Sequence, residues 1–252
     1  MGLFDLPGPL LTAIDNLLDF LPPLPRLALW AVITGALSMA GYWLLSNQTR
    51  VSEAKADALT TRRALSSYDG HEFNEVAPLI TASLRASLRH FGTVLWPALG
   101  GSLPALAIIV WVSNQFGYIL PDAGNAITVS TAPATALALA PADHSDANTE
   151  GYVAIWPAEN AQLPVGTVDE TFVVLPLPAP APVMHKKLWW NALIANPAGY
   201  LEDNASVNEL YLGIESQQLL HIGPAWLRGW AAPYFILLII SSLAIKAAFR
   251  IH

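Results

Sequence analysis

The sequence predicts a mainly α-helical integral membrane protein with three transmembrane helices, a cytoplasmic helical hairpin and a small extracytoplasmic α+β domain. Three observations lead to this prediction: few charges, three long uncharged apolar segments, and a one-sided distribution of Lys and Arg. Only 12% of the 252 residues are charged, and 54% are hydrophobic. Soluble domains carry about 25% charged residues, so lipid is the expected solvent for much of this chain.

The first transmembrane helix is predicted at residues 27–45, which contain no charged side chain. At about 1.5 Å per residue, this segment spans the hydrocarbon core of a bilayer. Trp30 lies near one end and Tyr42 and Trp43 near the other, where interfacial aromatic residues are expected. A buried helix of a soluble core is the alternative, and it is disfavoured because two similar segments follow.

The second and third transmembrane helices are predicted at residues 91–117 and 229–246. Two prolines and two glycines interrupt the second segment, namely Pro97, Gly100, Gly101 and Pro104. We expect a bent helix that packs against its neighbours through the glycines, with a short re-entrant segment as the alternative. The third segment is closed by Lys246 and Arg250.

The distribution of Lys and Arg predicts the orientation of the chain. Residues 46–90 hold six of the twelve cations, and two more, Lys246 and Arg250, close the third span. Because Lys and Arg concentrate in short cytoplasmic loops, we place residues 46–90 and the tail at 247–252 in the cytoplasm, with the N-terminus outside. High Ala and Pro content without cysteine is compatible with a bacterial inner membrane.

Residues 1–26 are predicted to hold an amphipathic helix that lies in the outer interface of the membrane. Leucines and Ile14 recur there at helical spacing, with Asp15, Asn16 and Asp19 between them. A helix packed on the outer domain is an equally supported alternative. Three prolines then turn the chain into the bilayer, namely Pro22, Pro23 and Pro25.

Residues 46–90 fit two helices joined by a turn at Asp69-Gly70. Apolar residues at helical spacing give the second helix one apolar face, which includes Ile80, Leu84 and Leu88. The segment is therefore predicted to be a short helical hairpin. A brief coiled coil is a weaker alternative, because neither helix is long enough for four heptads.

The extracytoplasmic domain is predicted at residues 118–228. Short β-like runs occur at residues 126–131, 151–156 and 171–175. Proline-rich connectors separate them, which favours edge strands or extended linkers over a long central sheet. From Lys187 onward the pattern predicts helices, and three tryptophans are expected to anchor the domain at the membrane surface, namely Trp189, Trp190 and Trp226.

No catalytic, cofactor-binding or metal-binding residue is predicted, and we expect no enzyme. The chain has no cysteine, which excludes disulfides, thiolate metal sites and iron–sulfur clusters. None of the six histidines lies inside a predicted span, and no H-x-x-x-H or E-x-x-H pair occurs. Nucleotide-binding and hydrolase motifs are missing as well. The net charge of −7 argues against nucleic acid as a partner.

Two sets of residues are candidates for function. Polar residues in or near the spans fit helix–helix hydrogen bonds or, as a sharper alternative, a mildly polar groove: Thr34, Ser38, Asn114, Gln115, Ser241 and Ser242. Cations on the predicted cytoplasmic side are candidate contacts for clients or partners: Arg50, Arg62, Arg63, Arg85, Arg89 and Lys246. No ionisable residue lies in the middle of a span, which argues against a pump or coupled transporter.

Two stretches carry a resemblance to a known family. They are LPPLPRLALWAVITGALSMAGYWLLSNQ, which leads into the basic hairpin, and YFILLIISSLAIKAAFR in the third span. With the order of the parts, they resemble the three-span core of the Oxa/YidC insertase superfamily, and above all the branch of the third subunit of the ER membrane protein complex and its archaeal relatives. The resemblance implies a cytoplasm-facing hydrophilic groove that helps hydrophobic segments enter the bilayer, with the hairpin receiving clients.

Two functions are therefore expected. One is an insertase-like factor for membrane-protein assembly, which the basic hairpin favours. The other is a non-catalytic accessory or scaffold subunit of a larger respiratory or photosynthetic membrane complex, which the broken second span and the Trp-rich outer face favour. In both, the partners are the lipid bilayer and other integral membrane proteins, and no cofactor is required.

Overall fold

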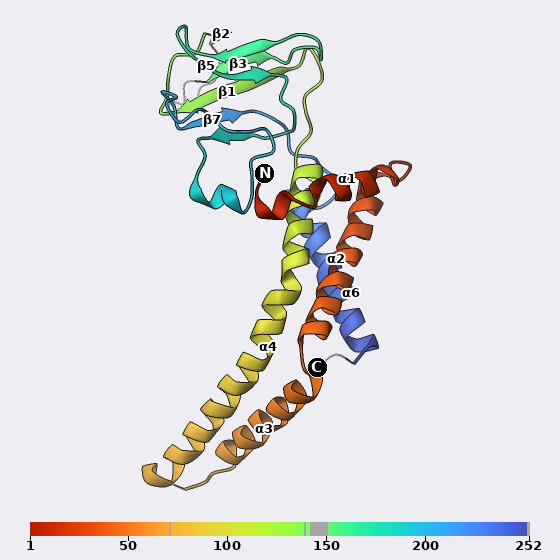
Figure 1. The fold of residues 1–252 in the computed structure, drawn as a ribbon, viewed down its shortest axis with the longest axis vertical. Coiled ribbons are helices and arrows are strands. Elements are labelled where there is room, and N and C mark those ends of the chain that lie inside the picture. The colour runs from red at the N-terminus through yellow and green to blue at the C-terminus, as the bar shows by residue number, and fades with distance from the viewer. Residues whose placement is uncertain (71, 139, 142–150, 251–252) are drawn as a thin grey trace. The chain divides into compact units, whose positions relative to one another are not determined.

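The computed structural model describes residues 1–70, 72–138, 140–141 and 151–250 (Figure 1). His71, His144 and His252 lie outside the described residues, as does the end of the predicted tail. The chain forms two compact units. The first combines Met1–Leu27 with Ala107–Pro233, and the second combines Ala28–Leu106 with Tyr234–His252.

Three helices are long and apolar enough to cross a membrane, namely α2 (Pro23–Leu45), α4 (Phe73–Phe116) and α6 (Ala231–Ala248). Helix α2 ends at the residue predicted from sequence and begins with Pro23, at a position where the missing N–H has no intrahelical partner to lose. The prediction of a mainly α-helical membrane protein with three spans is confirmed at this level.

Helix α4 is continuous over 44 residues, so the second half of the hairpin and the second span belong to one helix. The helix continues past Pro97 and Pro104, so the re-entrant alternative is wrong. The expected packing through glycines is present in the second unit. A Cβ atom on Gly101 would lie 2.6 Å from the backbone nitrogen of Tyr42 in α2, and one on Gly41 would lie 3.0 Å from the Cα of Gly101.

Helices α2 and α6 also pack closely in the second unit. The hydroxyl of Tyr234 donates a hydrogen bond of 2.7 Å to the Oγ1 of Thr34, which in turn donates one of 2.7 Å to the carbonyl of Trp30. Thr34 and Tyr234 are both fully buried. At the next residue of α2, a Cβ atom on Gly35 would collide with the Oγ of Ser241 in α6.

Helix α3 (Gln48–Ser66) pairs with the first part of α4 to form the hairpin (Figure 1). The side chain of Asn47 caps α3 by accepting a hydrogen bond of 3.1 Å from the backbone N–H of Arg50. The most buried hairpin residues are small: Val51 and Ala54 from α3, and Ser83 and Ala86 from α4. Small residues allow two helices to approach closely. The larger apolar residues of the hairpin therefore lie outside the seam, which is the contact between α3 and the first part of α4.

The first unit contains an antiparallel five-stranded sheet with strand order β2-β3-β1-β7-β6 and a separate β4–β5 hairpin. The strands are β1 (Ala126–Ala132), β2 (Ala140–Pro141), β3 (Tyr152–Ile155), β4 (Leu163–Gly166), β5 (Thr171–Leu175), β6 (Val183–His185) and β7 (Glu209–Leu212). The three strands expected from sequence correspond to β1, β3 and β5. In β1, Ile127, Val129 and Thr131 alternate into the interior, as the period of two requires.

The prediction of helices after Lys187 is wrong. That region holds only a 3₁₀ turn (Trp189–Ala192), the strand β7 and a single-turn helix α5 (Ala225–Arg228) among the described residues. In β7, Leu210 and Leu212 are buried between half-buried or exposed neighbours, which is the period of a strand. A short apolar run fits either period, and the tertiary partner β1 decides in favour of the strand.

The N-terminal segment packs on the loop between β6 and β7 in the first unit. A 3₁₀ turn (Leu3–Asp5) precedes helix α1 (Gly8–Asn16). The backbone N–H of Phe4 donates to the carbonyl of Leu193 over 2.9 Å, and the carboxylate of Asp5 accepts from the N–H of Ala195 over 2.7 Å. These contacts support the packed alternative for residues 1–26, whereas exposed residues such as Leu10 and Leu17 keep an apolar outer face on the same segment.

Candidate functional site

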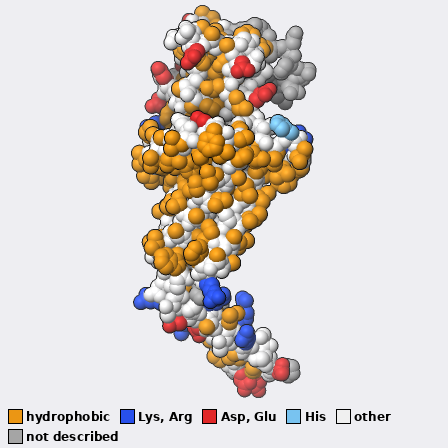
Figure 2. All heavy atoms as spheres, turned by 90° about the vertical axis from the view of Figure 1, so that its right-hand side faces the viewer, with side chains coloured by type: hydrophobic (Ala, Val, Ile, Leu, Met, Phe, Trp, Pro, Cys, Tyr) orange, Lys and Arg blue, Asp and Glu red, His pale blue; other side chains and the backbone are white. Residues whose placement is uncertain are grey.

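The hairpin exposes both cations and large apolar side chains. Six candidate cations of the sequence are all exposed, and none of them forms an ion pair with another described residue: Arg50, Arg62, Arg63, Arg85, Arg89 and Lys246. Exposed beside them are the large apolar residues of the hairpin: Leu59, Phe73, Ile80, Leu84 and Leu88. Figure 2 places Lys and Arg side chains where the apolar surface of the spans gives way to the hairpin.

This exposed surface has a physical origin in the hairpin seam. The apolar face of the second helix lies outside the seam, because smaller residues such as Ala54 and Ala86 occupy it. Leu84 is 58% exposed, and Leu88 is exposed to a similar degree one turn later. An unpaired apolar stripe flanked by arginines is unusual for a hairpin that has no partner, and it is typical of a surface that binds another chain.

Two adjoining cavities lie where the hairpin joins the spans in the second unit. The Lys246 cavity, about 310 Å³ in volume, is lined by Tyr42, Lys55, His90 and Lys246 together with an apolar wall. The Arg62 cavity, about 290 Å³, shares Lys55 and His90 with it and adds Arg62 from α3. The residues therefore come from four helices, α2, α3, α4 and α6.

Lys55 and His90 were not among the candidates from sequence. Lys55 and Arg62 are seven residues apart in α3, which places them on one face of the helix, next to the buried Val51 and Ala54. That spacing is the signal that sequence alone offered. His90 precedes the predicted second span by one residue, and nothing in the sequence brings it near Lys246.

The six polar candidates divide between the two units. Thr34, Ser241 and Ser242 lie at the α2–α6 contact, where Thr34 is hydrogen-bonded and the two serines face Gly35. Their arrangement is that of helix–helix packing. Ser38, also in α2, is half-buried. Asn114 and Gln115 belong to the other unit, so the structure does not assemble all six into one groove within either unit.

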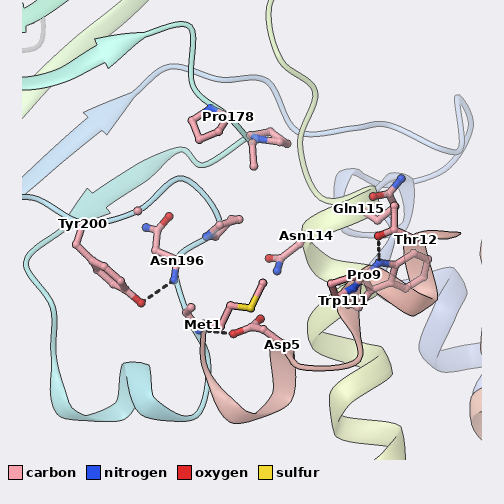
Figure 3. Close-up of a pocket in the computed structure, with 16 residues that line it drawn as sticks. Met1, Asp5, Pro9, Thr12, Trp111, Asn114, Gln115, Pro178, Asn196 and Tyr200 are labelled. Atoms are coloured by element: carbon pink, nitrogen blue, oxygen red, sulfur yellow. Dashed lines mark hydrogen bonds between the residues drawn. The ribbon is translucent and has the colours of Figure 1, made fainter.

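Asn114 and Gln115 line a separate pocket of about 610 Å³ in the first unit (Figure 3). Several of its polar groups are already paired. Trp111 donates from Nε1 to Thr12 over 2.9 Å, and the hydroxyl of Tyr200 accepts from the N–H of Asn196 over 3.0 Å. Its described lining contains no Lys, Arg or His, and proline rings form much of the wall.

No metal site is evident in the part of the chain that the structure describes. No three His, Asp or Glu side chains there gather closely enough to hold an ion. Comparison with known proteins adds no functional assignment, because no family model, curated protein or solved structure matches the chain. The features that bear on function are therefore the hairpin surface, the two cavities where the hairpin joins the spans, and the three spans.

Proposed function

We propose that this chain is an insertase-like assembly factor for membrane proteins, which uses the α3–α4 hairpin to receive hydrophobic segments before they enter the bilayer. The exposed apolar and cationic surface of that hairpin is the observation that supports the proposal. A hydrophobic segment leaving water gains roughly 25 cal/mol for each Å² of apolar surface that it buries. Leu84, Leu88 and their neighbours offer that surface beside three membrane-spanning helices.

In this proposal the arginines act as steering groups and the protein performs no chemistry. Exposed cations such as Arg63, Arg85 and Arg89 attract acidic residues that flank a client segment, and this attraction weakens as salt screens it. The proposal includes a location in a bacterial inner membrane. Its hairpin and C-terminus then lie in the cytoplasm and its N-terminus lies outside, as the distribution of Lys and Arg favours.

Site-specific photocrosslinking tests the proposal. A photoreactive amino acid at Leu84 should crosslink to newly made membrane proteins in cells, and the same amino acid at Val168, which is 92% exposed on the outer domain, should not. The triple variant Arg63→Gln/Arg85→Gln/Arg89→Gln should weaken the crosslinks at position 84. Equal client crosslinking from both positions, or none from position 84 during active synthesis, would contradict the insertase function.

An accessory subunit of a larger membrane complex is the second candidate. Large apolar residues exposed in the first unit favour it, among them Trp189, Ile222 and Trp226, which a partner subunit could cover. Extraction in mild detergent, followed by native gel electrophoresis and mass spectrometry, separates the two functions. A single complex of fixed stoichiometry supports the subunit, whereas many substoichiometric membrane proteins support the assembly factor.

A further inference from the structure

His90 has a buried ring nitrogen without a partner. Its Nδ1 is shielded from solvent and makes no hydrogen bond to any described residue. Buried polar side-chain atoms are hydrogen-bonded in the large majority of cases, so an exception calls for an explanation such as a bound water or ion. The same imidazole lines both the Lys246 cavity and the Arg62 cavity, so a ligand in either cavity can reach it.

The charges around His90 specify the ligand as an anion. Lys55, Arg62 and Lys246 line the two cavities, and the described lining of neither contains Asp or Glu. The three cations come from two helices that are far apart in sequence, α3 and α6, and each helix lines a cavity together with His90 of α4. Lys and Arg donate the charge-assisted hydrogen bonds that phosphate oxygens accept.

The apolar wall of the Lys246 cavity indicates the source of that anion. Met39, Val94 and Ala98 form an apolar side of the Lys246 cavity, in helices α2 and α4. These residues belong to the predicted spans, whereas Lys55 and Arg62 belong to the hairpin. A ligand that fills the whole site therefore needs an anionic end and a hydrocarbon end, and basic pockets between membrane helices bind anionic lipid head groups in this way.

We propose that the paired cavities hold an anionic phospholipid from the surrounding bilayer. Its phosphate group lies among Lys55, Arg62 and Lys246 and accepts a hydrogen bond from His90, and its acyl chains pack along Met39, Val94 and Ala98. The bound lipid would fill the space between the hairpin and the spans. This site is independent of whether the chain assembles other membrane proteins.

Native mass spectrometry of the full chain tests the proposal. The protein is purified in mild detergent with equimolar phosphatidylglycerol and phosphatidylcholine, and the retained lipids are counted. The wild-type chain should retain phosphatidylglycerol selectively. Each cation near an anionic head group contributes roughly a fivefold gain in affinity. The triple variant Lys55→Gln/Arg62→Gln/Lys246→Gln should therefore bind phosphatidylglycerol roughly a hundredfold more weakly.

The matched control is Arg63→Gln/Arg85→Gln/Arg89→Gln, which removes the same charge from exposed arginines that line neither cavity. It should retain phosphatidylglycerol as the wild-type chain does. Equal losses in the two triple variants, or no preference for phosphatidylglycerol in the wild-type chain, would overturn the proposal. Displacement of the lipid by inorganic phosphate would overturn it as well, since the site would then bind a soluble anion.

Two further variants test the imidazole. His90→Leu removes the ring nitrogens and should lower retention of phosphatidylglycerol, whereas His90→Gln keeps a hydrogen-bond donor at that position and should preserve most of it. Wild-type retention by His90→Leu would overturn the role assigned to His90. Circular dichroism of both variants establishes that any loss reflects the site and not the fold.

Discussion

At the scale of single residues, the most consequential contact is an ion pair that joins the N-terminal segment to the start of α2. The carboxylate of Asp15 is fully buried, and both of its oxygens accept hydrogen bonds from Arg26. Asp19 accepts a third hydrogen bond, of 2.7 Å, from the same guanidinium, whose Cζ lies 5.8 Å from the ring centroid of Phe116. Asp15 and Arg26 flank the Pro22–Pro23 corner, so their pairing fixes the turn.

Removing Arg26 should destabilise the protein strongly. Arg26→Gln leaves the buried Asp15 without a charge partner, which costs about 3–5 kcal/mol in comparable buried pairs. Asp19→Asn is the control, because the side chain of Asp19 is 61% exposed, and surface pairs contribute about 0–1 kcal/mol. Thermal unfolding in mild detergent measures both variants. Similar losses for the two would mean that the pair does not behave as buried.

The sequence pattern draws attention to the two acids of this contact but not to their pairing with Arg26. Asp15 and Asp19 were expected between the apolar residues of an amphipathic helix, either in the outer interface or packed on the outer domain. The structure pairs both with Arg26, which lies in the first turn of α2 beyond Pro22. Helical periodicity describes one straight element, so it gives no information on contacts made across a corner.

At the scale of elements, backbone contact between α2 and α4 determines how the spans pack. Gly41 and Gly101 face each other with no side chain between them. Lipid offers apolar surface as readily as a helix does, so helices in a bilayer associate through close van der Waals contact rather than by the hydrophobic effect. The two glycines permit that contact, and a methyl group on either one would separate the helices.

Gly101→Ala should therefore weaken the packing of the second unit. The added Cβ would lie 2.6 Å from the backbone nitrogen of Tyr42, which cannot move aside without shifting α2. Overpacking of this kind costs about 1–3 kcal/mol. Gly92→Ala is the control in the same helix, because a Cβ there meets nothing within 4 Å.

The control variant Gly92→Ala also has a predicted effect on stability. Alanine favours a helix over glycine by about 1 kcal/mol, so Gly92→Ala should be neutral or slightly stabilising in detergent thermal-shift measurements. Destabilisation by Gly92→Ala to the same extent as by Gly101→Ala would show that the effect arises from glycine content and not from the α2–α4 contact.

Elements that a long apolar segment or a β-branched run marks in the sequence were predictable. Elements that depend on a partner distant in sequence were not. Uncharged segments of membrane length predicted the spans in α2, α4 and α6, and β-branched runs predicted β1, β3 and β5. The strand β7 was missed because ELYL is too short to distinguish a period of two from one of 3.6, and pairing with β1 determines it. The cavities were missed for the same reason, since Lys55 and Lys246 are distant in sequence.

At the scale of the whole molecule, the distribution of cations predicts which side of the membrane each part occupies. The hairpin and the end of α6 carry eight of the twelve Lys and Arg residues, in segments that a three-span chain places on one side. The strands lie in the segment between α4 and α6, which the same alternation places on the opposite side.

Cysteine labelling tests this topology directly, because the natural chain has no cysteine of its own. Ser67→Cys places a thiol on the hairpin and Val168→Cys places one in the outer domain, both at exposed positions and without a change of charge. In intact spheroplasts, a membrane-impermeant maleimide should label the Val168→Cys variant and should label the Ser67→Cys variant only after lysis. The reverse pattern would invert the orientation.

The unbroken course of α4 gives the hairpin a mechanical property. From Phe73 to the predicted membrane boundary at His90, the helix is about 27 Å long at 1.5 Å per residue, and no proline lies between Pro78 and Pro97. The second helix of the hairpin is therefore a direct extension of the second span, and it moves when that span tilts. A tilt of that span by about 10° would displace the tip by about 5 Å, so a change in bilayer thickness that tilts the span moves the tip of the hairpin.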